Sequence, residues 1–259
     1  MKLFFREYGS GQPMIILHGL LGMSDHWIPL AKKFPENFHV IVPDLRNHGQ
    51  SSHDSEFNYE AMQSDIIELL QELGIKKSVF IGHSMGGKLA MLLALSHPAM
   101  VEKLIIADIS PVAYPLDADH EMMQVFNKIN PETAQSRNEL QQMITETTTD
   151  PLLQGLIVKN IVAGINGSFR WKPDMNSISR NLERIFDFPD LKNVSYNKPA
   201  LFIKGSRSNY IRRKDFQTIN MLFTSNRILT IENAGHWLHA EKPNEFLQIC
   251  IDFLKPETD

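Results

Sequence analysis

A short apolar run leads straight into a glycine-flanked serine at Val79-Phe80-Ile81-Gly82-His83-Ser84-Met85-Gly86-Gly87. The apolar residues before Gly82 are typical of a buried strand, and Ser84–His97 repeats apolar residues at helical spacing. A serine on a sharp strand-to-helix turn adopts a strained backbone, and side chains two residues to either side would collide with neighbouring backbone. The sequence therefore predicts that Ser84 is a nucleophile lifted into a cleft, with a glycine-rich turn without chemistry as the alternative.

Two backbone donors are expected beside Ser84. The turn directs the Met85 N–H, at the start of the helix, toward the space that the serine faces. His18-Gly19-Leu20-Leu21-Gly22 directly follows the apolar run Ile15–Leu17, in the first strand-to-helix loop. We expect the Leu20 N–H to be the second donor of an oxyanion hole and the His18 side chain to brace the loop. A merely structural turn is the alternative interpretation of this loop.

The rest of the chain alternates strand and helix signals. Unbroken apolar runs of this length suit a sheet that is covered on both faces, so the sheet should be mostly parallel and doubly wound. The predicted strands are Met14–Leu17, Val40–Val42, Ser78–Ile81, Leu104–Ala107, Ala200–Ile203 and Ile228–Ile231. The last helix, Asn244–Leu254, places Cys250 on its apolar face, where it is expected to be a small core side chain.

One segment interrupts the alternation. No convincing strand is predicted from Pro111 to about Asp190, whereas a capping box at Ser136 and Glu139 and an Asp150-Pro151 start indicate helices. We predict a helical cap over residues 111–190, inserted after the strand that ends at Asp108, and a core formed by residues 1–110 and 191–259. Its natural place is over the carboxyl ends of the strands, where α/β sheets bind ligands.

Of the ten histidines, His236 lies between the last predicted strand and the final helix. Its imidazole can take a proton from Ser84 and return it near neutral pH, so we predict that it is the general base. The neighbouring Trp237 is a candidate wall of the substrate pocket, with ordinary core packing as the equal alternative.

These motifs, in this order, resemble the α/β-hydrolase superfamily across nearly the whole chain. The details are closest to the small YbfF-like bacterial esterases, in the segments Arg46–Gly49, Gly82–Lys88, Asp108–Val112 and Gly235–Pro243. The resemblance implies a cofactor-free serine esterase with a helical cap that acts on acyl esters, with acyl-CoA thioesters as a further candidate class.

The acid departs from the commoner superfamily pattern. No carboxylate follows the strand Leu201–Lys204 directly, and the first one downstream, Asp215, falls in a predicted helix. Asp108 ends the neighbouring strand, and the YbfF-like group is similar in having aspartate there and a serine at the Ser208 position. The resemblance therefore assigns the orienting carboxylate to Asp108 and an auxiliary hydroxyl to Ser208. A helix cap is the alternative role for Asp108.

Composition limits the remaining classes. With 42% hydrophobic and 22% charged residues over 259 positions, the chain is typical of soluble globular proteins and not of disordered, collagen-like or membrane-spanning ones. A net charge of −4 gives no electrostatic case for nucleic acid or stable membrane association as the main partner. The single cysteine excludes an intrachain disulfide, and no metal or nucleotide motif occurs. The charged N-terminus lacks a signal-peptide apolar region, so a cytoplasmic location is expected.

Two points stay open at the level of sequence. Asp44, Arg46 and His48 form a second polar cluster, for which a structural role is favoured over a place at the active-site rim. A cofactor-free carbon–carbon bond hydrolase or a menaquinone-pathway-type lyase would share the serine turn, and a non-catalytic binding module is a further alternative. The small-molecule substrate is expected to be an ester, and the sequence carries no signal for an oligomeric state.

Overall fold

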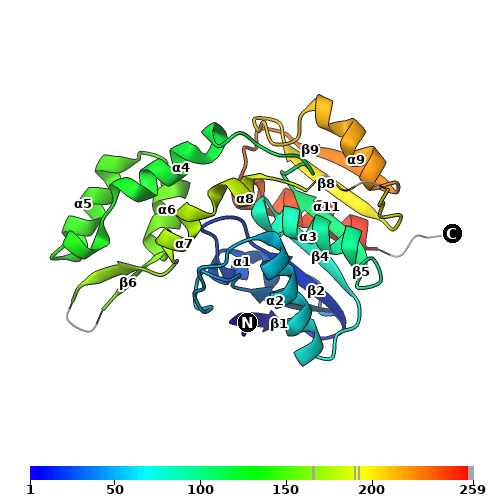
Figure 1. Ribbon diagram of the computed structural model, residues 1–259, viewed down its shortest axis with the longest axis horizontal. Coiled ribbons are helices and arrows are strands. Elements are labelled where there is room, and N and C mark those ends of the chain that lie inside the picture. Colours follow the sequence, from blue (N-terminus) through cyan, green and yellow to red (C-terminus); the bar gives the residue numbers. More distant parts are fainter. Residues whose placement is uncertain (165–166, 190, 192, 256–259) are drawn as a thin grey trace.

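The computed structural model describes residues 1–164, 167–189, 191 and 193–255, and within them the chain folds around a seven-stranded sheet (Figure 1). The strands are β1 (Phe5–Tyr8), β2 (Gln12–Leu17), β3 (Phe38–Pro43), β4 (Ser78–His83), β5 (Val101–Ala107), β8 (Ala200–Gly205) and β9 (Asn226–Ile231). Their order across the sheet is β1-β3-β2-β4-β5-β8-β9, and each neighbouring pair is parallel except β1 with β3. The predicted mostly parallel α/β sheet is therefore confirmed.

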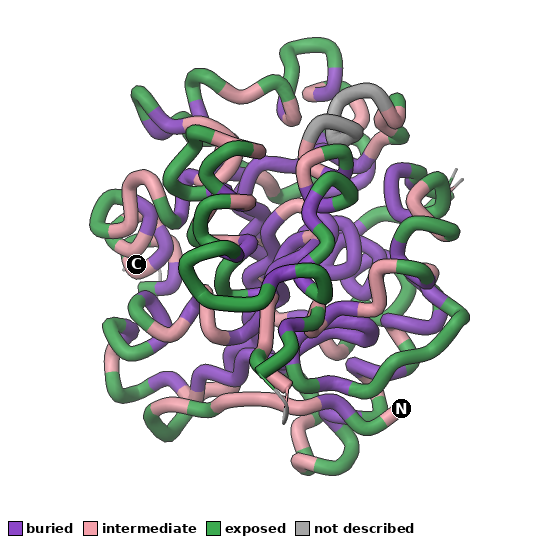
Figure 2. Tube along the Cα trace, turned by 90° about the vertical axis from the view of Figure 1, so that its left-hand side faces the viewer, coloured by how far each residue is buried: buried purple, intermediate pink, exposed green. Residues whose placement is uncertain are grey.

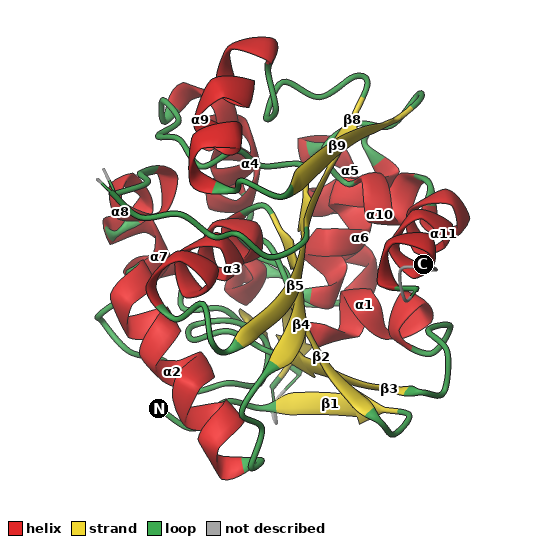
Figure 3. Cartoon of the chain, turned by 90° about the vertical axis from the view of Figure 1, so that its right-hand side faces the viewer, coloured by secondary structure: helices red, strands yellow, loops and turns green. Residues whose placement is uncertain are grey.

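Helices cover both faces of the sheet, as the apolar strands require (Figure 3). One face packs against α1 (Ser24–Ala31), α10 (Leu238–Glu241) and α11 (Pro243–Leu254), and the other against α2 (Tyr59–Glu72), α3 (Met85–Ser96) and α9 (Phe216–Leu222). Alternate residues of β2 enter different cores, because Met14 packs with the first group of helices and Ile15 with the second. Cys250 is fully buried in the first core, where burial raises the pKa of its thiol.

The segment between β5 and β8 lies to one side of the sheet (Figure 1). It contains α4 (Asp117–Lys128), a 3₁₀ turn η1 (Pro131–Thr133), α5 (Arg137–Thr147), α6 (Pro151–Lys159), α7 (Met175–Arg180) and α8 (Leu182–Phe186). The predicted helix starts are present, since Ser136 Oγ accepts the Glu139 N–H and Asp150 Oδ1 accepts the Leu152 N–H. In Figure 2 the buried segments gather toward the middle of the molecule, and the exposed segments lie largely around the outside.

The expectation that this segment holds no strand was wrong. β6 (Ile161–Ala163) and β7 (Phe169–Trp171) pair antiparallel and form a separate two-stranded sheet. Each strand has only three residues, which is too short for an alternating pattern to stand out in the sequence.

A buried lysine ties this segment to the helix that follows the serine turn. Lys88, on α3, is 2% exposed, and its Nζ donates hydrogen bonds to the carbonyl oxygens of Phe186 (2.6 Å) and Asp187 (2.9 Å). The same ammonium lies 4.8 Å from the centre of the Tyr114 ring, and the Tyr114 N–H donates to the Phe186 carbonyl. The beginning and the end of the segment are therefore joined to each other and to α3.

None of the helices described is both long and apolar enough to cross a bilayer.

Candidate active site

Ser84 stands at the turn between β4 and α3 with a positive φ of 51°. The glycines around it leave room for crossing backbone, because a Cβ on Gly82 would collide with the Gly86 carbonyl and one on Gly86 with the Leu17 carbonyl. The Ser84 N–H donates to the Ala107 carbonyl of β5 at 3.1 Å, which fixes the turn on the sheet. The side chain is half-buried and borders a cavity.

The two predicted oxyanion donors lie beside this serine. Leu20 and Met85 line a small recess of about 20 Å³ together with Ser84. Met85 is the first residue of α3, where a helix leaves its N–H groups without intrahelical partners. Among the hydrogen bonds of the described residues, none occupies the Leu20 N–H.

Asp108, His236 and Ser208 form one hydrogen-bonded group at the carboxyl end of the sheet. Asp108 follows β5, is fully buried and has a φ of 53°. The His236 ring donates from Nδ1 to Asp108 Oδ2 at 2.8 Å, and the Ser208 hydroxyl donates to the same oxygen. Asp108 Oδ1 accepts the Gly205 N–H at 3.0 Å. With three donors around it, this carboxylate acts only as an acceptor, and the neutral His236 ring carries its proton on Nδ1.

Ser84 and His236 line the same cavity, which has a volume of about 420 Å³. Trp237 and Leu20 belong to its wall, and so do residues of the segment between β5 and β8, among them Met122 and Leu153. The hydrogen bonds of the described chain do not include one between Ser84 Oγ and His236, and such bonds are often long in ligand-free sites. Among the hydrogen bonds of the described residues, none occupies Nε2 of His236.

His83, next to the serine, supports the histidine loop. Its Nε2 donates to the His236 carbonyl oxygen at 2.9 Å, and the two rings lie 4.7 Å apart. Burial lowers the pKa of His83 well below its ordinary value, so this ring is neutral. A neutral neighbour does not repel the positive charge that His236 would gain on taking a proton.

His18 and His48 brace the loops around Leu20. His18 donates from Nδ1 to the Gly19 carbonyl and accepts the Leu45 N–H at Nε2. His48 Nε2 accepts the Leu21 N–H at 3.0 Å, so the segment that carries Leu20 is held from two sides.

The second polar cluster of the sequence is buried structure. Asp44 accepts the backbone N–H groups of Ser24 and Gln50. Arg46 forms a two-point ion pair with Asp65 on α2, with N–O distances of 2.6 and 2.8 Å. Sequence reasoning did not find Asp65, because its partner lies 19 positions earlier and the helical pattern alone does not distinguish a buried aspartate from a solvated one. None of these carboxylates contacts His236.

Asp215, the competing acid, also lies away from the histidine. It belongs to a short 3₁₀ helix, η2 (Arg213–Asp215), and is 4% exposed. Its Oδ2 accepts the Arg212 N–H at 2.8 Å and faces the Ser110 hydroxyl at 3.4 Å. Within the residues described, no cluster of three or more His, Cys, Asp and Glu is arranged to hold a metal ion.

Buried neutral histidines predict a loss of stability in mild acid. Burial lowers the pKa of His18 and His26 to about 4 and that of His48 and His239 to about 3. In the unfolded chain a histidine binds its proton near pH 6.5, about the reference value. The unfolded chain therefore binds more protons between these values, and the free energy of unfolding falls as the pH drops from about 6.5 toward 4.

Denaturant unfolding at a series of pH values measures this effect. We expect a stability that is level between pH 7 and 8 and that declines below about pH 6.5, by up to about 1.4 kcal/mol per pH unit for each histidine. An unfolding free energy at pH 5 equal to that at pH 7 would contradict the neutral burial of these rings.

The chain resembles known proteins over almost its full length. The model of the α/β-hydrolase fold family matches residues 12–243. The sn-1-specific diacylglycerol lipase ABHD11 of Danio rerio is 35% identical over 258 residues, which cover 97% of this chain and 81% of that protein. Esterase YbfF of Escherichia coli is 30% identical over 245 residues, which cover 95% and 94%. A solved structure described as a marine microorganism esterase has a TM-score of 0.94 and 38% identity, and covers 98% of this chain and 99% of its own.

The chain belongs to the α/β-hydrolase fold family. This confirms the fold and the resemblance inferred from the sequence. Within the family it is a carboxylic ester hydrolase, in line with the names of its relatives, so the predicted reaction class is confirmed as well.

Proposed function

We propose that this ester hydrolase works through an acyl-enzyme on Ser84, with His236 as general base and Asp108 as the carboxylate that orients it. The observation that carries the proposal is the shared cavity of Ser84 and His236, with Asp108 Oδ2 2.8 Å from the far nitrogen of the histidine ring. Because Asp108 holds the ring proton on Nδ1, Nε2 is left as a basic lone pair on the cavity side.

The first half of the reaction transfers the acyl group to the serine. Ser84 Oγ attacks the ester carbonyl while His236 Nε2 takes its proton, and the carbonyl oxygen becomes an oxyanion that accepts hydrogen bonds from the Leu20 and Met85 N–H groups. The C–O bond to the alcohol then breaks, and the imidazolium gives its proton to the departing alkoxide. Asp108 stabilises the imidazolium without taking its proton.

The second half releases the acid. His236 removes a proton from a water molecule, the hydroxide attacks the acyl carbonyl, and the same two N–H groups hold the new oxyanion. Collapse returns the proton from His236 to Ser84 Oγ and frees the carboxylic acid. Ser208 contributes a hydroxyl to Asp108 and acts only through that carboxylate.

The cavity favours small acyl groups. Ser84 borders two spaces, a recess of about 20 Å³ that Leu20 and Met85 also line and the cavity of about 420 Å³ that it shares with His236. We propose that residues 111–190 act as a cap, because Met122, Val125 and Leu153 line the space that Ser84 faces. The proposed substrates are short acyl esters, and glycerides and acyl-CoA thioesters are further classes to compare. One relative is named as a diacylglycerol lipase, which makes glycerides a direct comparison.

A fluorophosphonate label and a substrate panel test the proposal together. We expect a single adduct, mapped by mass spectrometry to Ser84, and turnover of p-nitrophenyl acetate and butyrate that is lost in proportion to labelling. Butyryl-CoA and mono- and diglycerides in the same panel rank thioesters and glycerides against simple esters. Full turnover in a completely labelled enzyme, or a label on another residue, would contradict the role of Ser84.

A further inference from the structure

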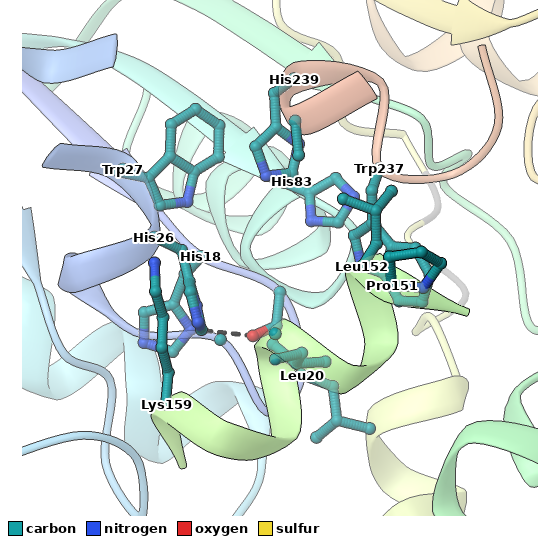
Figure 4. A pocket seen from close by; sticks show the side chains of 15 residues that line it. His18, Leu20, His26, Trp27, His83, Pro151, Leu152, Lys159, Trp237 and His239 are labelled. Atoms are coloured by element: carbon teal, nitrogen blue, oxygen red, sulfur yellow. Dashed lines mark hydrogen bonds between the residues drawn. The ribbon is translucent and has the colours of Figure 1, made fainter. Parts of the chain in front are cut away.

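A second pocket adjoins the cavity of Ser84 and is not used by the proposed mechanism. It has a volume of about 220 Å³ and lies between α6, α1 and α10 (Figure 4). Leu20, His83 and Trp237 line both spaces, so they form a shared wall between the pocket and the serine. The two spaces are therefore neighbours in the fold, separated by these three side chains.

Most of the lining is apolar, and its polar side chains are Lys159 and the four histidines His18, His26, His83 and His239. Pro151, Leu152 and Trp237 lie on one side in Figure 4, whereas His26 and Lys159 lie on the other. A group that fills the pocket would thus place an apolar part against the tryptophan side and a polar end toward His26 and Lys159.

His26 presents a donor without an acceptor. The Met23 N–H donates to His26 Nδ1 at 3.1 Å, so the neutral ring carries its proton on Nε2. That Nε2 is buried and has no hydrogen-bond partner among the described residues. A buried N–H without an acceptor lowers the stability of the fold by about 1–3 kcal/mol. A ligand oxygen that accepts this hydrogen bond would recover part of that free energy.

The charge around His26 is positive. Burial is the main cause of the lowered pKa of His26, and the charges of Lys159 and Lys172 lower it further. Asp25 raises this pKa, and its carboxylate is already paired with Arg6. Lys159 is exposed at the pocket and forms no ion pair within the described part of the chain. Lys172 contacts only the sulfur of Met23, at 3.8 Å, among the hydrogen bonds described for its Nζ.

We propose that this pocket binds an anionic group, a carboxylate or a phosphate, carried on an apolar arm of the ester substrate. The His26 N–H and the Lys159 ammonium are the two donors, and the charge of Lys159 favours an anionic oxygen over a neutral one as the acceptor. The proposal rests on the proposed function, because the pocket gains its role from the ester held at Ser84. It predicts a preference for acidic amphiphilic esters over neutral ones of the same length.

Tryptophan fluorescence provides a binding test that does not need turnover, because Trp27 and Trp237 both line the pocket. The probes are octanoate, octyl phosphate and octanol, which share one apolar chain and differ in the head group. We expect at least one of the two anions to bind, with the same affinity for the wild-type enzyme and for the Ser84→Ala variant. The anion that binds more tightly identifies the preferred head group. Lys159→Met should weaken the binding of that anion by about tenfold and leave octanol unchanged.

Lys214→Met is the matched control, since Lys214 is exposed and lines neither pocket. Lys159→Arg keeps the charge and should restore most of the anion affinity. Equal affinity for octanol and the two anions, or a Lys159→Met variant that behaves like Lys214→Met, would overturn the proposal. Failure of the Ser84 mechanism would instead appear as a missing fluorophosphonate adduct, with these affinities unchanged.

Discussion

Ser84→Ala is expected to lower kcat for p-nitrophenyl butyrate by roughly five to six orders of magnitude. The variant loses the atom that attacks the ester, and only binding and the two N–H donors remain to favour hydrolysis by water. The fold should be unchanged, because alanine tolerates the turn about as well as serine and the surrounding glycines stay in place. Initial rates with circular dichroism on the same samples measure both effects.

Ser64→Ala is a matched control for this substitution. Ser64 lies exposed on α2, and its hydroxyl donates to the Glu60 carbonyl one turn earlier. The kcat of the Ser64→Ala variant should equal that of the wild-type enzyme. A folded Ser84→Ala variant within tenfold of the wild-type rate would exclude Ser84 as the nucleophile.

Asp108→Asn is expected to lower kcat by up to about four orders of magnitude. All three groups around the carboxylate are donors, namely the His236 Nδ1–H, the Ser208 hydroxyl and the Gly205 N–H. The asparagine amide places its NH₂ group, a donor, against one of these donors. The His236 ring avoids this clash between donors when its proton moves to Nε2, because Nδ1 can then accept a hydrogen bond from the amide. That tautomer has no basic lone pair toward Ser84. kcat/KM on one short-chain ester, with unfolding curves for each variant, is the measurement.

Two further substitutions separate the roles of the neighbouring groups. Ser208→Ala removes one neutral hydrogen bond to Asp108 and should cost about fivefold in kcat. Asp215→Asn should leave kcat unchanged, because Asp215 contacts Arg212 and Ser110 and not His236. A nearly normal Asp108→Asn beside an inactive Asp215→Asn would assign the acid to the other position.

Six of the seven strands in the main sheet were predictable because each contains a short, mainly apolar run. β1 was not predicted, since Phe5-Arg6-Glu7-Tyr8 mixes aromatic and charged residues, and it is an edge strand paired on one side only. Its pairing with β3 is antiparallel, and strand-and-helix alternation does not anticipate such a pair. Edge strands with charged residues are common because they discourage further pairing.

The grouping of Asp108, Ser208 and His236 was predictable for a different reason. Parallel strands end at the same edge, so residues just after β5, β8 and β9 converge whatever lies between them in sequence. The His26 and Lys159 pair had no such signal. These residues lie on α1 and α6, and helical periodicity predicts which face of each helix is buried but not which two helices meet.

The backbone conformations of Ser84 and Asp108 have a consequence for anyone who wishes to stabilise this enzyme. Both residues hold φ values above 50°, in a region that favours glycine and costs other residues on the order of 1–3 kcal/mol. Glycine at Ser84 would relieve that strain and remove the proposed nucleophile. Glycine at Asp108 would also leave the Gly205 N–H, the Ser208 hydroxyl and the His236 Nδ1–H without their acceptor, which offsets the gain. We therefore expect a screen that rewards heat resistance alone to enrich glycine, and with it inactive enzyme, at Ser84, so a thermostable design has to keep this residue fixed.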